Sequence, residues 1–311
     1  MSRPLKVAKF GGTSVGAPES LKGVVEIVKN SASRHRMVVI ASAVSGVTDL
    51  LVNACNSYDE SYDKNTFLNS LHDRHVTLAS AVLQPDSLDR YLPVLEAVLA
   101  SLDEVMGDLR TPGKEAWCRD AVIAAGERMS VPLVALALID AGLDAIPVDS
   151  APLVVTDDTY GEAIVDLSTT KRNIQDWHQN IPEKTIPVVT GFIGSTPDGH
   201  TTTLGRGGSD YSAALFASAL HAVVMERWTD VDGIYAEDPR KNKHAKRLAS
   251  IVLEEAWAWN QAGRLGMHRK ALDPLVSEGI PVHVRCTLTP HRFGTLIVPA
   301  GREQAISAVA L

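Results

Sequence analysis

Short, mainly apolar runs recur along the chain and alternate with longer stretches of helical periodicity. Four of these runs, at residues 5–10, 37–41, 186–191 and 222–228, are short and bounded by glycine or polar residues. Such runs predict strands that are buried on both faces of a sheet. Because each of the first two runs is followed by a loop and then a helical pattern, the sequence predicts an α/β fold with a mostly parallel sheet.

The middle of the chain predicts helices. Residues 58–107 read as a helical insertion that breaks at Pro93, since proline removes a helical hydrogen bond. Two further helices are expected at residues 116–125 and 131–141, separated by a connection that contains Gly126 and Glu127.

Residues 192–204 predict a hairpin that turns at Pro197-Asp198-Gly199. No repeat and no clear linker divides the chain. We therefore expect one domain in two lobes, approximately residues 1–200 and 201–311.

Composition limits the classes of function. Of the 311 residues, 45% are hydrophobic and 22% are charged, which allows a sizeable buried core. The net charge of −7 argues against a general nucleic-acid or membrane-surface binder. Three scattered cysteines form no CxxC pair and indicate free thiols in a reducing compartment. With no signal peptide and no apolar run expected to span a bilayer, the predicted location is the cytoplasm.

A glycine-rich loop, Gly205-Arg206-Gly207-Gly208-Ser209-Asp210, leads into an apolar helix that is expected to begin at Asp210. Glycines permit close backbone approach, and the helix start behind them supplies unpaired N–H groups that suit an anion. Arg206 adds a planar fork for a carboxylate or phosphate. Asp210 implies that the site also faces a positive group. The loop matches the dinucleotide-binding fingerprint except that Asp210 stands in place of the third glycine. Asp230 follows at the sequence separation expected for a ribose contact, so a nicotinamide-dependent oxidoreductase is an alternative.

Lys9 ends the first predicted strand and is followed by Gly11 and Gly12. An ammonium beside exposed backbone N–H groups suits the neutralisation of a transferring phosphoryl group. The spacing is not that of a Walker A loop. The alternative is an ordinary strand–turn–helix with a solvated lysine.

Three other groups of polar residues have a functional and a structural interpretation. Ser42 and Thr48 follow the second strand and either bind a carboxylate or cap a helix. Glu127 lies among apolar residues and either pairs with a substrate amine or lies on the surface. A later loop lines a nucleotide pocket or is a polar surface loop, and its residues are Thr229, Asp230, Tyr235 and Arg240. No HExxH, GxSxG or Cys/His cluster favours a metalloenzyme or a serine hydrolase.

Taken together, these segments resemble aspartate kinase, in the amino-acid kinase superfamily. The segments, in the family's order, are Lys9-Phe10-Gly11-Gly12-Thr13-Ser14-Val15, Ser42…Thr48, Gly126-Glu127…Ser130, Gly205 to Asp210, and Trp228 to Tyr235 with Asp238-Pro239-Arg240. The resemblance implies a three-layer α/β/α sandwich around a mostly parallel sheet. It implies transfer of the γ-phosphoryl group of ATP, with Mg²⁺, to the side-chain carboxylate of L-aspartate, the first step of lysine, threonine and methionine biosynthesis.

The resemblance also implies roles for single residues. Lys9 stabilises the transferring phosphoryl group, Gly11 and Gly12 supply backbone contacts, and Asp210 organises the site. The aspartate site is Ser42, Thr48, Glu127 and Arg206. The nucleotide side is Thr229, Asp230, Tyr235 and Arg240.

Two departures from the family's pattern stand out. Leu265 falls where the family has a lysine that reaches ATP, so either Arg264 takes that role or nucleotide binding is weaker. The family's chain continues into ACT-type regulatory domains, whereas this one stops at Leu311. It is then either a fragment of a longer chain or an unregulated enzyme, and we expect no lysine or threonine feedback site within it.

A homodimer is the default expectation for such an enzyme. Two alternative functions remain on the same fold. One is a kinase of another acidic amino acid or derivative, and the other is a binding or regulatory module that has lost catalysis.

Overall fold

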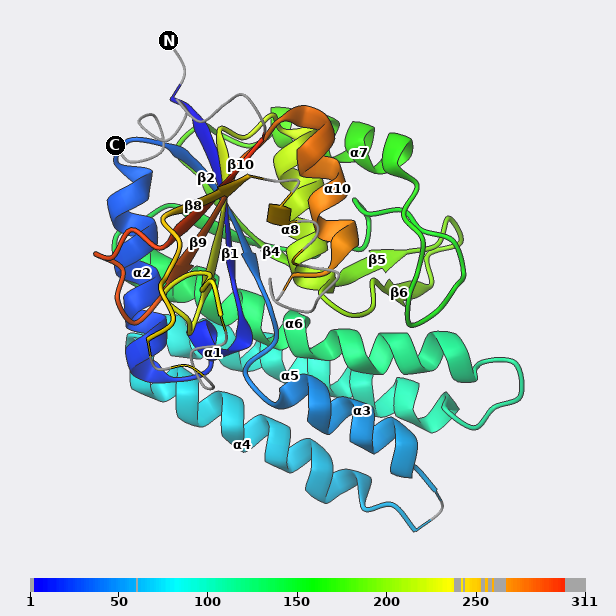
Figure 1. Cartoon of the computed structure of the whole chain (residues 1–311). Coiled ribbons are helices and arrows are strands. Elements are labelled where there is room, and N and C mark those ends of the chain that lie inside the picture. The colour runs from blue at the N-terminus through cyan, green and yellow to red at the C-terminus, as the bar shows by residue number, and fades with distance from the viewer. Residues whose placement is uncertain are drawn as a thin grey trace.

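The computed structural model describes residues 3–59, 61–237, 242, 244–252, 255–256, 259 and 267–299. In this part of the chain, an eight-stranded sheet has the order β3-β4-β2-β1-β7-β9-β10-β8 (Figure 1). The first six strands in this order run parallel, and β10 is antiparallel to β9. The strands are β1 (Leu5–Phe10), β2 (Arg36–Ala41), β3 (Ala145–Val148), β4 (Ile186–Thr190), β5 (Ile193–Ser195), β6 (Thr201–Thr203), β7 (Val224–Thr229), β8 (Ser250–Val252), β9 (Val282–Cys286) and β10 (Thr295–Val298).

Helices cover both faces of this sheet (Figure 1). One hydrophobic cluster joins the sheet to α2 and α6 with the helices packed on them, and the other joins it to α7, α8 and α10. The expected three-layer α/β/α sandwich with a mostly parallel sheet is therefore confirmed. The helices are α1 (Gly12–Val15), α2 (Pro18–Ala32), α3 (Val47–Ser57), α4 (Lys64–Val82), α5 (Pro85–Asp108), α6 (Glu115–Asp140), α7 (Leu167–Gln179), α8 (Gly208–Ala219) and α10 (Arg269–Glu278).

The prediction of two helices flanking Gly126 is wrong, because α6 is continuous. A glycine inside a helix costs about 1 kcal/mol relative to alanine. Here it allows close packing, since a Cβ at Gly126 would lie 2.7 Å from the Cβ of Ala43. Burial of α6 along most of its length outweighs the local penalty of Gly126. This burial arises from tertiary contacts, so no local sequence pattern reveals it.

The predicted break at Pro93 is also wrong, because α5 continues through it. An interior proline costs about 3 kcal/mol. Tyr91 and Leu95, on either side of the proline, are both fully buried. Tertiary packing of α5 therefore holds the helix together through the proline.

Helix α6 also contradicts the expectation that no segment is long and apolar enough to cross a bilayer. By length and composition Glu115–Asp140 passes that test, but 83% of its most apolar window is buried inside the fold. A core helix of a globular domain has the same composition, so the apolar residues of α6 are accounted for by the contacts it makes within the protein.

The predicted hairpin is confirmed. Strands β5 and β6 pair antiparallel, with Ile193 opposite Thr203, and Gly199 in the turn has a φ of 86°. The hairpin ends directly before the glycine-rich loop.

Candidate functional site

The loops after β1, β2, β4 and β7 leave the same edge of the sheet, because these four neighbouring strands run parallel. Ligands in open α/β sheets bind outside the carboxyl ends of the strands. Gly11, Ser42, Gly191 and Asp230 each follow the end of one of these strands. This edge is therefore where the segments selected from the sequence converge.

Lys9, at the end of β1, contacts the first turn of α8. Its Nζ lies 2.9 Å from Oδ1 of Asp210. The second oxygen of Asp210, Oδ2, accepts a hydrogen bond from Nε of Arg227 on β7 at 3.0 Å. Burial raises the pKa of Asp210, but the charges of Lys9 and Arg227 outweigh this and hold the pKa below its ordinary value. The carboxylate is therefore ionised and holds two cations at the edge of the sheet.

The glycines after β1 bring two loops into contact. A Cβ at Gly12 would lie 2.7 Å from the carbonyl oxygen of Ala43, in the loop after β2. The backbone N–H of Ser45 donates to the carbonyl of Gly12 at 3.2 Å. Gly11 donates its N–H to the carbonyl of Trp228 at 3.4 Å, which connects the loop to β7. Any side chain at Gly12 would push these loops apart.

Glu127 on α6 is buried and reaches the same loop. Its Oε1 accepts the backbone N–H of Ala43 at 3.0 Å, whereas Oε2 has no hydrogen-bond partner among the described residues. Burial raises the pKa of Glu127 to about 7, and the Ala43 N–H and the charges of Lys9 and Arg128 oppose that rise. A buried carboxyl oxygen without a partner is costly unless a ligand supplies one. Glu127 is not on the surface, so the functional interpretation is favoured.

Ser42 and Thr48 lie on either side of the same loop. The carbonyl of Ser42 accepts the hydroxyl of Ser130 at 2.8 Å, and Thr48 lies in the first turn of α3. The predicted cap of α3 by Thr48 is wrong, because the helix begins after Gly46, whose φ is 78°, with no side-chain cap. In the described part of the chain, neither the Ser42 hydroxyl nor the Thr48 hydroxyl makes a hydrogen bond.

The glycine-rich loop leads into α8, as predicted. Gly205 and Gly207 have φ values of 67° and 71°, in the left-handed region that favours glycine. Arg206 between them is exposed and forms no hydrogen bond or ion pair with the described residues. It is therefore placed by its backbone, with its guanidinium open to a ligand.

The segment before the loop is held from two sides. Asp120 of α6 accepts the backbone N–H groups of Thr203 at 2.6 Å and of Gly161 at 2.9 Å. Lys270 of α10 donates to the carbonyl of Leu204. No sequence motif indicated Asp120 or Lys270, because both act on backbone groups distant in the chain.

The expected nucleotide side starts at the end of β7. The Thr229 hydroxyl donates to Asp230 at 3.0 Å, and the Tyr235 hydroxyl donates to Asp232 at 2.7 Å. Asp232 also pairs with Arg292 at 2.9 Å. The hydrogen bond from Tyr235 to Asp232 is the main reason why the pKa of Tyr235 is raised.

Arg240 and Arg264 lie outside the described residues, as does Leu265. No contact can therefore be assigned to the two remaining residues of the predicted nucleotide side.

Besides Asp120 and Lys270, two further residues at the site were missed by the sequence analysis. Arg227 is a partly buried residue of β7 that follows the buried Glu226, and these two charges within an apolar run were the available signal. Phe192 has a φ of 72°, which is unusual for a bulky residue, and donates its N–H to the hydroxyl of Ser212 at 2.9 Å. Its ring excludes any side chain at Gly208. A strained backbone of this kind leaves no signal in the sequence.

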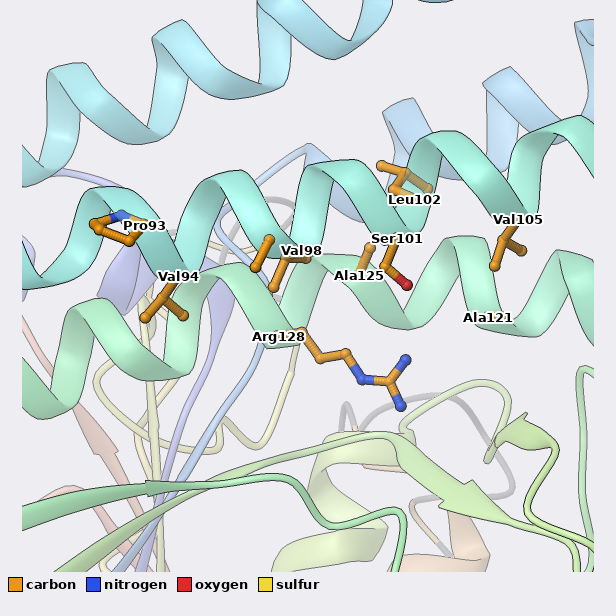
Figure 2. Close-up of a pocket in the computed structure, with 10 residues that line it drawn as sticks. Pro93, Val94, Val98, Ser101, Leu102, Val105, Ala121, Ala125 and Arg128 are labelled. Atoms are coloured by element: carbon orange, nitrogen blue, oxygen red, sulfur yellow. The ribbon is translucent and has the colours of Figure 1, made fainter.

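A separate pocket of about 490 Å³ lies between α5 and α6 (Figure 2). Apolar side chains line most of it, with Arg128 at its edge. Arg128 pairs with Asp149 at 2.8 Å and donates to Thr201 at 3.1 Å. None of the predicted site residues lines this pocket, so we place the candidate site at the edge of the sheet.

Comparisons with known proteins agree with this geometry. Residues 4–286 match the model of the amino acid kinase family. The chain is 33% identical over 296 residues to bifunctional aspartokinase/homoserine dehydrogenase 1 of Zea mays, covering 94% of this chain and 32% of that protein. It is 33% identical to lysine-sensitive aspartokinase 3 of Escherichia coli (strain K12), covering 94% of this chain and 63% of that protein.

Among solved structures, E. coli aspartokinase III in complex with aspartate and ADP superposes with a TM-score of 0.84 at 32% identity, covering 95% of this chain and 64% of that one. The chain thus spans between about a third and two thirds of the length of these relatives. The family match extends over every strand of the sheet except β10 and over every predicted site residue that the structure describes. The chain belongs to the amino acid kinase family.

Proposed function

We propose that this protein transfers the γ-phosphoryl group of ATP to the side-chain carboxylate of L-aspartate. The observation that carries the proposal is the position of Lys9, ion-paired to Asp210 at the edge of the sheet and close enough to Glu127 to act on its pKa. A phosphate-neutralising cation and a buried carboxylate suited to an amine thus share one site. The similarity to aspartokinases supports the same assignment.

The chemistry requires little beyond positioning and neutralisation of charge. An oxygen of the aspartate side chain attacks the γ-phosphorus, and the new phosphorus–oxygen bond forms as the bond to the β–γ bridging oxygen breaks. The electron pair of the broken bond goes to that oxygen, which leaves with ADP. Because the carboxylate carries no proton, no general base is needed. Lys9 neutralises the transferred group. Gly12, in the first turn of α1, offers a backbone N–H beside it, and Gly11, whose N–H bonds to Trp228, holds the loop against β7.

The remaining polar groups account for recognition of a free amino acid. The unpartnered oxygen of Glu127 accepts a hydrogen bond from the α-ammonium group of the substrate, and the exposed Arg206 binds its α-carboxylate. Ser42 follows β2 and Thr48 lies in the first turn of α3, and their hydroxyls are further hydrogen-bonding groups for the amino acid. An acidic amino acid with a blocked amine would leave Glu127 buried without a partner and would be rejected.

Mg²⁺ enters this scheme with the nucleotide. Among the described residues no cluster of three potential metal ligands is present, and both oxygens of Asp210 already hold cations. The protein residues therefore do not fit a dedicated metal site. Mg²⁺ commonly binds through substrate phosphates and water, and we assign no catalytic step to a protein-bound ion.

A substrate comparison tests the proposal. ADP release is measured with L-aspartate, L-glutamate and N-acetyl-L-glutamate, and hydroxylamine traps any acyl phosphate formed. We expect ADP release and a hydroxamate with L-aspartate above the other two. Turnover with a different acceptor would reassign the substrate. ADP release with none of them would favour a binding module on the same fold.

The pH dependence of aspartate binding should follow Glu127. Its pKa of about 7 means that the side chain is mostly protonated below that pH, and a proton must then leave before the carboxylate can pair with an ammonium group. Aspartate KM should therefore rise about tenfold per pH unit below pH 7 and level off above it. Glu127→Gln should raise KM at neutral pH and remove this slope. The same slope in Glu127→Gln would show that another group is responsible, and the KM for ATP serves as the internal control.

A further inference from the structure

Arg227 and Lys9 are direct neighbours across two parallel strands. The two residues are paired in register on β7 and β1, and each contacts one oxygen of Asp210, at 3.0 and 2.9 Å. The side chains of Lys9, Arg227 and Asp210 are only 12%, 14% and 5% exposed. One carboxylate therefore fixes two cations side by side in a largely buried position.

The electrostatics of this arrangement favour an anionic ligand. Lys9 and Arg227 are directly opposite each other on neighbouring strands, where like charges are unfavourable, and Asp210 offsets part of that repulsion. Taking such charges out of water is costly in a purely structural role. A bound phosphate chain turns the same arrangement into an attraction, because it places negative charge against both cations.

The position along β7 indicates which part of the nucleotide Arg227 faces. Arg227 lies two residues before Thr229, where β7 ends and the expected nucleotide side begins, whereas Lys9 precedes the glycines of the first loop. A guanidinium group presents five N–H donors in a planar fork that matches phosphate oxygens. Arg227 is thus on the side of the leaving ADP, and Lys9 on the side of the transferred group.

We propose that Arg227 is a second catalytic cation, which neutralises the negative charge that builds on the bridging oxygen and the ADP phosphates as the γ-phosphorus–oxygen bond breaks. The proposal rests on the phosphoryl transfer proposed above. In this scheme Asp210 holds Lys9 and Arg227 at a fixed separation, so that neither has to move during the reaction.

Substitution of Arg227 tests this role. Arg227→Met should lower kcat by roughly 10²- to 10³-fold, the usual effect of removing one preorganised charge-stabilising group. It should also weaken MgATP binding in calorimetry while aspartate KM changes by no more than about threefold. Arg227→Lys, which keeps the charge without the fork, should recover about tenfold or more of the lost kcat.

Arg285 provides a matched control on the neighbouring strand. It is paired in register with Trp228, lies 3.9 Å from Glu226 and stacks on Trp228 at 4.3 Å, which places it on the opposite face of the sheet from Arg227. Arg285→Met should lower Tm without a selective loss of kcat or of MgATP affinity.

Equal kinetic effects of Arg227→Met and Arg285→Met, or full activity and unchanged MgATP binding in Arg227→Met, would overturn the assignment. If the wild type accepts another substrate, the kinetics are repeated with that acceptor. If it accepts none, the proposed function fails, and the effect of Arg227→Met on MgATP affinity still decides whether Arg227 faces the phosphates.

Discussion

Lys9→Met is expected to lower kcat by roughly 10³-fold or more, while aspartate KM stays within about threefold of the wild-type value. Lys9 faces Asp210 and the loop after β1. A Cβ added at Gly11 would lie only 3.7 Å from the Nζ of Lys9. Its charge is therefore positioned for the phosphoryl group, whose negative charge must be stabilised in the transition state. Methionine keeps the length of the side chain and removes only the charge.

Steady-state kinetics with both substrates measure this effect, with Tm as the check on folding. Lys171→Met is the matched control, because Lys171 is also ion-paired, to Glu278 at 2.8 Å, but lies on α7 at the surface. That pair should contribute at most about 1 kcal/mol to stability and nothing to kcat. A Lys9→Met enzyme with normal kcat, or one in which only aspartate KM changes, would remove Lys9 from the chemical step.

Arg206→Ala should raise aspartate KM by about 10- to 100-fold and change kcat much less. A charge-assisted pair with a carboxylate contributes about 1.5–3 kcal/mol. Because the α-carboxylate does not react, this contact is equally strong in the ground and transition states, so its loss appears in KM. The left-handed glycines on either side keep the backbone of the loop in place when the side chain is removed.

Arg172 on α7 is an exposed arginine and supplies the control, since Arg172→Ala should leave both kinetic constants unchanged. Aspartate KM is measured at saturating MgATP. An Arg206→Ala enzyme with unchanged aspartate KM would exclude Arg206 from the amino-acid site. A large increase in the KM for ATP alone would move it to the nucleotide.

Much of the site was accessible from the sequence because its parts are local. Strand β1 begins and ends at the predicted residues, and the helix after the glycine-rich loop starts within two residues of the expected position. Buried strands appear as mainly apolar runs, and glycines mark positions where the backbone must turn or approach closely. The sequence also placed lysine, arginine and aspartate in these segments, although it could not say which of them meet.

The parts that could not be predicted depend on contacts between distant segments. The unbroken α6 depends on burial against the loop after β2 and against α5, which outweighs the helix penalty of Gly126. The raised pKa of Glu127 arises from that same burial.

By itself, the sequence determined the α/β class, the strand–loop–helix segments and the residue types available for chemistry, because these follow from local periodicity and backbone preference. Only the tertiary structure decided that β1 lies between β2 and β7, which sets Lys9 beside Arg227 and places both on Asp210. Strand order and register depend on pairing between segments more than two hundred residues apart. No local pattern encodes such a pairing, because its free energy comes from hydrogen bonds and packing that exist only once the sheet has formed.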